Sequence, residues 1–259
     1  MDVISSSTAD NKLSCIARQF PIVHIDFYGH GWHTGGASAF LPTLAAAPSG
    51  CLQAVQQVTT MHYCGVPATC VAELIRLCPQ LQQVEVSGVQ PDSRGSVSAA
   101  LSSLRGLAAP LQVLHLTLDC EESWTGHGPS SIDAARAAIA LACLTGLQGL
   151  RLDLRSMDPG ERLLQVALPA LTALSTLELH FENARLPEPQ LIRCPSSLRA
   201  LKLEMHHCSW GLGVLKSAGP LPGVTRLELS TQRWGLGRAV SRKQILAAWD
   251  GRSGGVVAC

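Results

Sequence analysis

Apolar residues recur along this chain at the spacing i, i+3, i+5. Six copies of the pattern are clear, and they begin at Leu81, Leu111, Leu147, Leu174, Leu198 and Val224. A weaker copy begins at Val55, and we interpret Phe20/Val23/Ile25 as a degenerate first copy. Successive copies start 24 to 36 residues apart. A period of this length is typical of an architecture in which similar units of secondary structure stack on one another.

Each copy predicts a short β-strand. Its i+3 and i+5 side chains lie two residues apart and therefore point to the same face of the strand. A single strand of this kind cannot bury its apolar row, whereas parallel stacking of successive copies buries a continuous ladder. Thirty-nine leucines, of which 36 follow residue 50, supply most of that ladder.

The segments between the strands must return the chain along the other side of the sheet. Two of them, 68–78 and 131–143, predict helices because their apolar residues recur at helical spacing. The apolar stripe of the first is Val71, Leu74, Ile75 and Cys78, and that of the second is Ile132, Ala135, Ile139 and Cys143. The fold class predicted from these patterns is α/β with a parallel sheet.

At this point the sequence resembles the leucine-rich repeat family, whose motif is LxxLxLxxN/C. The resemblance covers residues 50–232, or 20–232 with the degenerate copy, and is closest to the cysteine-containing and ribonuclease-inhibitor-like repeats. Cys78-Pro79-Gln80-Leu81 matches the CPxL element of that subtype, and 66–77 matches its helix. The resemblance implies a horseshoe-shaped solenoid with a concave parallel sheet, convex helices and about seven or eight repeats. Because Cys64, Cys120 and Asn183 fall at i+9 instead of i+8, we expect irregular turns.

The repeats divide the chain into four parts. Residues 1–50 form an N-terminal segment with the degenerate copy and a Gly/Ala-rich linker, and 51–236 hold the repeats. Residues 237–250 are predicted to form a C-terminal capping helix, because Ser241-Arg242-Lys243-Gln244 is a capping-box pattern before apolar residues. The tail, 251–259, is expected to be disordered.

Function is expected on the face opposite the leucines. Neighbouring residues on a strand alternate sides, so the i+4 and i+6 residues point to the concave surface. This surface is polar and mixed in sign, with an acidic excess in the later repeats. Its candidate partner-binding residues are His115, Arg151, Asp153, Glu178, His180, Lys202, Glu204 and Glu228. The alternative is that they are solvated strand residues that serve solubility.

Two insertions add to this candidate surface. They are the segments 90–96 and 121–130, and the second carries Trp124 among acidic residues and a histidine. Long loops in a repeat array tend to be functional. We therefore count Trp124 among the candidate partner-binding residues.

Composition narrows the class of partner. A net charge of +1, 15% charged residues and 46% hydrophobic residues exclude a charge-extended disordered chain. The sequence has no basic domain, so a nucleic-acid partner is not expected. The longest apolar run, 137–144, is too short to span a membrane, and no secretory signal is evident. We interpret the ten cysteines, which lack CxxC spacing, as reduced, buried thiols in a cytosolic or nuclear setting. The expected location is cytoplasmic, with a cytoskeletal or axonemal association as its variant.

Catalytic and cofactor motifs are missing from the sequence. It contains no GxSxG, GxxxxGK[ST] or HExxH pattern. The densest histidine cluster is His24, His30 and His33, with Asp26, in a glycine-rich stretch. His206-His207-Cys208 lacks a second Cys/His pair at zinc spacing, and adjacent residues do not readily all turn to one ion. No metal, cofactor or catalytic residue is predicted.

Three hypotheses of function follow. The leading one is a non-enzymatic scaffold that binds protein through the concave face and the inserted loops. The second, implied by family resemblance, is an adaptor in a larger assembly such as a ubiquitin ligase or a cytoskeletal or axonemal complex. The third is an enzyme or metal protein centred on His24, His30 and His33. The sequence leaves the partner and the oligomeric state open.

Overall fold

The fold was analysed in a computed structural model of the chain. The structure describes residues 24–27, 52–60, 66–90, 97–107, 110–119, 131–155, 160–182, 193–206, 223–232 and 256–258. They belong to two compact units, residues 1–118 (unit 1) and residues 119–259 (unit 2). Each unit is described by itself.

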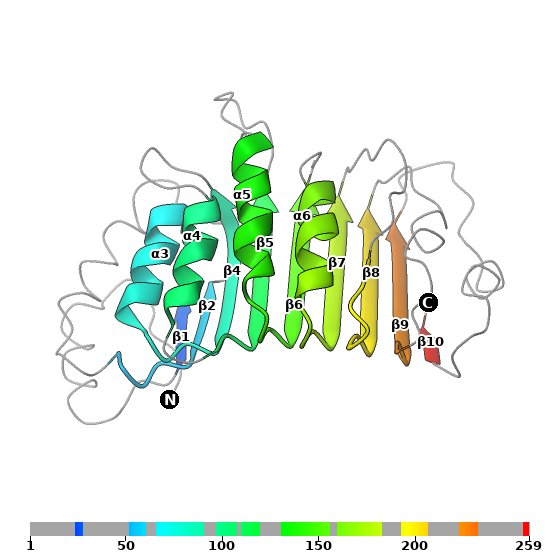
Figure 1. The fold of residues 1–259 in the computed structure, drawn as a ribbon, viewed down its shortest axis with the longest axis horizontal. Helices are drawn as coiled ribbons and strands as arrows, with labels where there is room; N and C mark the ends of the chain where they lie inside the picture. Colours follow the sequence, from blue (N-terminus) through cyan, green and yellow to red (C-terminus); the bar gives the residue numbers. More distant parts are fainter. Residues whose placement is uncertain are drawn as a thin grey trace. The chain divides into compact units, whose positions relative to one another are not determined.

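The described part of unit 1 contains parallel strands and two α-helices. Along the chain its elements are β1 (His24–Phe27), β2 (Gln57–Thr60), β3 (Val66–Pro67), α3 (Ala68–Leu77), β4 (Gln83–Gln90), α4 (Val97–Ser103), the 3-10 turn η2 (Leu104–Gly106) and β5 (Val113–Asp119), whose last residue crosses the boundary. The strands pair in the order β1-β2-β4-β5, with β3 beside the end of β4. Helices α3 and α4 pack against each other on one face of these strands (Figure 1).

Unit 2 repeats the arrangement with longer stretches of regular pairing. Its described elements are α5 (Ser131–Ala142), β6 (Gly149–Arg155), α6 (Gly160–Ala167), the 3-10 turn η3 (Leu168–Ala170), β7 (Thr176–Glu182), β8 (Ala200–His206), β9 (Arg226–Gln232) and β10 (Val256–Ala258). The strands pair in parallel in their order along the chain. Strands and helices therefore alternate in an α/β fold, as the pattern predicts.

The apolar ladder is confirmed in each unit. In unit 2, Leu150, Leu177, Leu201 and Leu227 are register partners on successive strands, and all four are buried. In unit 1, Val58, Val84 and Leu114 form the corresponding row and are also buried. Continuous burial of such a row is the main hydrophobic stabilisation of stacked strands.

The same turn precedes the strands in both units. The amide of the first residue of a copy donates to the carbonyl three residues earlier at Val55, Leu81, Leu147, Leu174 and Leu198. The carbonyl of the next residue then accepts two amides from the following copy. Gln82 O, for example, accepts from the amides of Gln112 and Val113, and Gln148 O accepts from Ser175 and Thr176. Each turn thus satisfies its backbone groups through the next one.

A glycine is required where one of these turns lies close to the preceding one. A Cβ at Gly223 would lie 2.8 Å from the carbonyl oxygens of Leu198 and Ser196 and would collide with the Arg199 guanidinium. Nη1 of Arg199 donates to Gly223 O at 3.3 Å and to Ser196 O at 3.2 Å. The side chain missing at Gly223 leaves the space that this arginine fills.

Of the two predicted helices, the first is correct and the second is wrong in its buried face. Helix α3 buries Val71, Leu74 and Ile75, and Cys78 after it is also buried. In α5, however, Ile139 is 59% exposed and Cys143 after the helix is exposed. The buried residues there are Ala137, Ala138, Ala140, Leu141 and Leu144. Small alanines at these positions allow α5 to pack closely, so helical spacing of the larger residues pointed to the wrong face.

Two further predictions are corrected at the ends of the chain. Ile25 on β1 is the register partner of Val58, not of Thr60, so the first copy is Ile22/Ile25/Phe27 and not Phe20/Val23/Ile25. In the tail, predicted to be disordered, Val256–Ala258 forms β10 and pairs with β9 because its extended backbone continues the ladder of parallel hydrogen bonds. The predicted capping helix at 237–250 lies outside the described residues.

Candidate functional site

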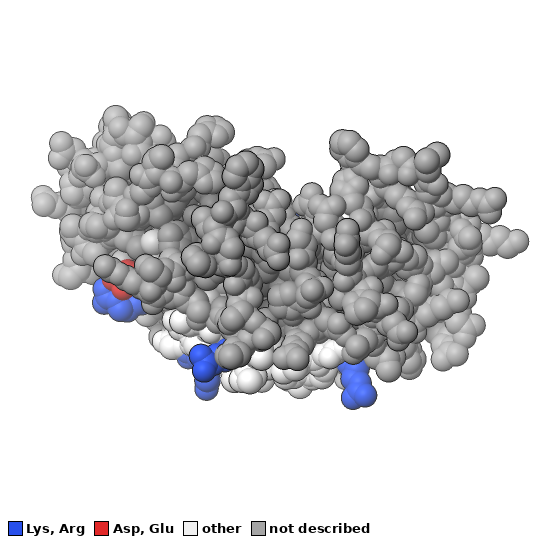
Figure 2. All heavy atoms as spheres, turned by 90° about the horizontal axis from the view of Figure 1, so that it is seen from above, with Lys and Arg blue, Asp and Glu red and all other residues white. Residues whose placement is uncertain are grey.

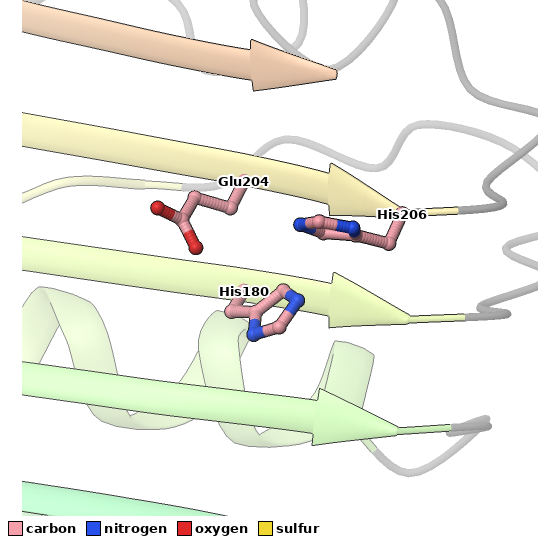
Figure 3. Close-up of side chains that lie close together, drawn as sticks. All are labelled: His180, Glu204 and His206. Carbon is pink, nitrogen blue, oxygen red and sulfur yellow. The ribbon is translucent and has the colours of Figure 1, made fainter. Parts of the chain in front are cut away.

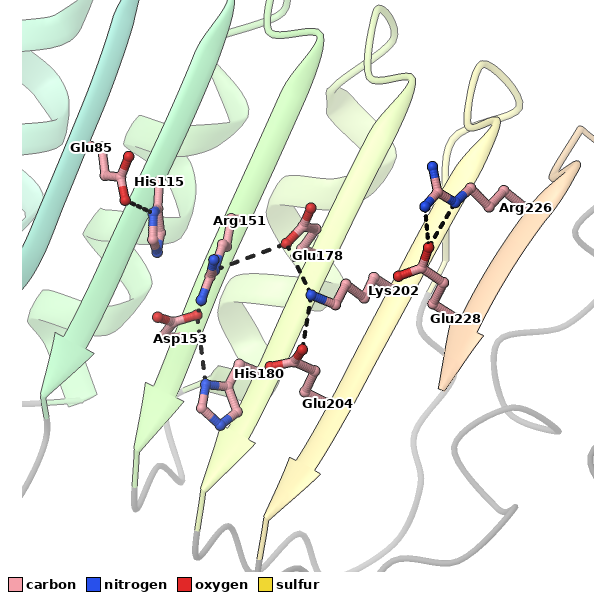
Figure 4. A network of polar contacts seen from close by, with 10 residues as sticks. All are labelled: Glu85, His115, Arg151, Asp153, Glu178, His180, Lys202, Glu204, Arg226 and Glu228. Carbon is pink, nitrogen blue, oxygen red and sulfur yellow. Dashed lines mark hydrogen bonds and ion pairs between the residues drawn. The ribbon is translucent and has the colours of Figure 1, made fainter. Parts of the chain in front are cut away.

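The candidate residues of unit 2 lie on alternate positions of its strands, opposite the leucines. Arg151 on β6, Glu178 on β7, Lys202 on β8 and Glu228 on β9 are register partners, and we call them the charged row. Two residues further along each strand lie Asp153, His180, Glu204 and Ser230, which we call the histidine row. Together the two rows form the polar face of unit 2. Figure 4 views this face with the helices behind the strands.

Charges alternate in sign along the charged row. Glu178 lies between two cations, with its Oε2 atom 4.0 Å from Arg151 Nε and 3.9 Å from Lys202 Nζ. Lys202 Nζ also donates to Glu204 Oε1 at 2.8 Å, and Arg151 Nε donates to Asp153 Oδ1 at 3.1 Å (Figure 4). The predicted acidic excess is therefore largely balanced by pairing within the face. Partly exposed pairs of this kind contribute little each to stability.

The hydrogen bond between Lys202 and Glu204 stabilises the charged form of both side chains. The hydrogen bond from Lys202 is the main cause that lowers the pKa of Glu204, and the same bond raises the pKa of Lys202. Both groups are therefore charged at neutral pH. Arg226 Nε donates to Glu228 Oε1 at 2.7 Å, which anchors the last carboxylate of the charged row.

Two of the predicted partner-binding residues are buried, contrary to the expectation that they project from the face. His115 is 7% exposed and Asp153 is 6% exposed. In unit 1, Nδ1 of His115 lies 2.8 Å from Oε1 of Glu85, which covers it. Asp153 is enclosed by Arg151 and His180. These two residues support their neighbours and do not themselves offer surface to a partner.

The structure brings His180, Glu204 and His206 together, a group that sequence reasoning missed. The three side chains offer ligand atoms that all lie within 4.8 Å of one another. The rings of His180 and His206 meet edge to face, with centroids 4.7 Å apart. Figure 3 shows the three side chains on the same side of β7 and β8. The available signal was the even spacing of Lys202, Glu204 and His206, which places His206 on the same face of β8.

Arg226 was also missed, because it lies at i+2 of its copy and the prediction used only i+4 and i+6. The same alternation of sides reaches i+2, so the signal was present. Trp124 and the insertion 121–130 lie outside the described residues, as do His30 and His33 and the segment 91–96 of the other insertion. His24 lies on β1, where the structure describes its backbone.

Of the described cysteines, Cys194 has a pKa that argues against a role as nucleophile. Cys70, Cys78, Cys143 and Cys194 are not joined in disulfides. Burial raises the pKa of the Cys194 thiol to about 11, so this group is neutral at physiological pH and a weak nucleophile.

The described basic side chains seen from one side of the molecule are scattered. Lys and Arg side chains of the described residues do not gather into a basic patch on the face seen in Figure 2. Among the described helices, none is long and apolar enough to cross a membrane.

Comparison with known proteins leaves the family open. No protein-family model matches the chain, and a search of curated proteins found no match to it.

Proposed function

We propose that this chain is a leucine-rich repeat protein that binds a protein partner through the polar face of unit 2. The observation that carries the proposal is the charged row, in which cations and anions alternate in register across four parallel strands. Strand residues are held rigidly, so this chain presents a preorganised pattern of charge. It therefore loses little conformational entropy when a partner binds.

Membership of the family is supported by the repeated unit. The apolar residues at i+3 and i+5 stack in register on neighbouring strands of unit 2, and within each unit the same pair of turn hydrogen bonds joins successive copies. Helices lie on the side of the sheet that the apolar residues face (Figure 1). In repeat arrays of this design the face opposite the helices is the one used for binding.

A protein partner fits this face better than a small ligand. The side chains of the charged row are between 27% and 37% exposed, so they are held by neighbours and still accessible. Alternating charge suits a surface of complementary alternating charge and rejects one of a single sign. Burial of these pairs against a partner would strengthen them by excluding water.

Affinity capture with matched variants tests the proposal. Glu178→Lys and Glu228→Lys are combined in one variant, and Glu73→Lys on α3 is the control because Glu73 is 37% and Glu178 is 36% exposed. Circular dichroism and denaturation first establish that both variants are folded. We expect partners captured by the natural chain and by the control to be lost from the double variant. Retention of every partner by the double variant would contradict the proposal.

The identity of the captured proteins separates two of the hypotheses. Components of a ubiquitin ligase, or of a cytoskeletal or axonemal complex, are the partners that the adaptor hypothesis requires. Partners without such components favour the general scaffold.

A further inference from the structure

We propose that His180, Glu204 and His206 form a binding site for a divalent transition-metal ion, of which Zn²⁺ is the one that fits best. This inference goes beyond the proposed function, because it concerns the histidine row and not the charged row.

The sheet itself brings the three side chains together. His180 on β7 is the register partner of Glu204 on β8, and His206 follows Glu204 by two residues on the same face. Neighbouring parallel strands lie about 4.8 Å apart, and alternate residues of one strand about 6.6 Å apart. The ligand atoms of His180, Glu204 and His206 already lie within 4.8 Å of one another. Tetrahedral zinc ligands at about 2.0–2.1 Å from the ion need separations of roughly 3.3 Å, which small side-chain rotations supply.

The donor set selects the kind of ion. Two imidazoles and one carboxylate are the ligands found in zinc sites that keep a fourth position for water. Magnesium and calcium prefer oxygen ligands throughout, so two histidines argue against them. Glu204 is held as a carboxylate by Lys202 on its Oε1 atom. Its second oxygen gives the carboxylate a further position from which to coordinate.

Asp153 completes the environment as a positioning residue. Its Oδ1 atom lies 3.8 Å from Nδ1 of His180, and Arg151 Nε holds the same oxygen at 3.1 Å. At 3.8 Å the two groups attract each other without a hydrogen bond, and a small rotation of the His180 ring brings them within hydrogen-bond range. A carboxylate bonded in this way orients a metal-binding imidazole and raises the basicity of its other nitrogen. That other nitrogen, Nε2 of His180, is shielded from solvent, so an ion bound there would be partly desolvated.

The local charge favours a cation. Asp153, Glu178 and Glu204 contribute three carboxylates around the group, against the two cations Arg151 and Lys202. The acidic balance offsets the repulsion that Lys202 alone would exert on a bound ion.

Metal titration of the full chain tests the site. After chelation to remove metal, Zn²⁺ is added in competition with a chromogenic chelator, and Co²⁺ is added separately to record its visible absorption. We expect one site that involves these residues, with a tetrahedral Co²⁺ spectrum. Combined His180→Asn and His206→Asn should weaken Zn²⁺ binding at that site at least about 100-fold, and Asp153→Asn should weaken it about 10- to 100-fold.

A second double variant controls for the other histidine cluster of the sequence. His30→Asn with His33→Asn should leave the affinity and the Co²⁺ spectrum unchanged. If folding of the His180/His206 variant is impaired, Glu204→Gln alone provides the same test, because it keeps the size of the side chain.

The proposal is overturned if the natural chain shows no Zn²⁺ binding above the chelator, or if binding depends on His30 and His33 and not on His180, Glu204 and His206. Its failure is separate from failure of the proposed function, since the capture variants change Glu178 and Glu228 and leave all three ligands in place.

Discussion

The two units share one repeated structure but differ in how regularly their strands pair. In unit 2, β6 with β7, β7 with β8 and β8 with β9 stay in register over seven residues each. In unit 1, the register of β4 with β5 shifts between Val86 and Val89, where Gly88 lies in the strand. A glycine inside a strand often marks a bulge of this kind.

Regular register explains why the polar site is found in unit 2. Cross-strand rows need the same face to be presented by several strands in succession, and only continuous register supplies that over the length of a strand. The described polar pairs of unit 1 join residues of two neighbouring repeats or of a single helix. They are His115 with Glu85 across β4 and β5, Gln112 with Gln82, and Glu73 with Arg76 within α3. The same repeated structure thus carries a network across four strands in unit 2, whereas the polar contacts given above for unit 1 each join two side chains.

The largest expected effect comes from the ladder. Leu177→Ala in unit 2 should lower the free energy of unfolding by about 2–5 kcal/mol, because Leu177 is fully buried and leaves a cavity. Val84→Ala in unit 1 removes fewer carbon atoms and should cost less. Chemical denaturation of both variants measures the difference, and an equal or larger loss at Val84 would contradict the expectation that the cost follows the buried carbon atoms removed.

Glycine substitutions compare the turns of the two units. Gly223→Ala should destabilise by about 1–3 kcal/mol, since its Cβ would meet two carbonyl oxygens and Arg199. Gly106→Ala in unit 1 is the matched control, because nothing lies within 4 Å of the Cβ that it would gain. Thermal denaturation should show little change or a small gain at Gly106. A similar loss at both sites would show that helix and turn propensity, not close approach, sets the effect.

Loss of a polar contact should cost more stability in unit 2 than in unit 1. Asp153→Asn should cost about 1–3 kcal/mol, because Asp153 is buried between Arg151 and His180. Glu85→Gln in unit 1 should cost less, since Glu85 is 43% exposed and glutamine keeps an oxygen for His115. Urea denaturation at neutral pH measures the free energy of unfolding of both variants. A larger loss for Glu85→Gln than for Asp153→Asn would contradict this prediction.

The smallest expected effect concerns Glu73 on α3. The hydrogen bond from Arg76 lowers the pKa of Glu73, so its contribution to stability is present above the pKa of an unfolded glutamate and is lost as the pH falls through the lowered value. Glu73→Gln should therefore be slightly less stable than the natural chain at neutral pH and equal to it in acid. Denaturation midpoints of both proteins across that pH range measure this. A difference that persists in acid would assign the effect to helix propensity instead.

Much of the fold could be predicted because it depends on residues close together in sequence. The spacing of Leu174, Leu177 and Leu179 fixes one strand and its buried face without reference to any other repeat. Helix α3 was predicted for the same reason. The buried face of α5 was not, because alanines carry too little hydrophobic signal to outweigh Ile139.

The candidate site could be predicted only in part. Alternation along a strand correctly assigned Glu178, Lys202 and Glu204 to one face. It gave no account of burial, so Asp153 and His115 were expected at the surface. The sequence analysis also compared His206 only with the adjacent His207 and Cys208. The residues that lie close to it are His180 on β7 and Glu204, two positions earlier on β8.

The sequence by itself determined the repeated strand, its apolar ladder and the polar character of the opposite face, because these follow from periodicity within each copy. Only the tertiary structure decided which polar residues meet. Copies are separated by segments of unequal length, and the register between strands is set by turn hydrogen bonds and close contacts such as Arg199 with Gly223. That register places His180 beside Glu204 and so turns separate residues of two repeats into one group.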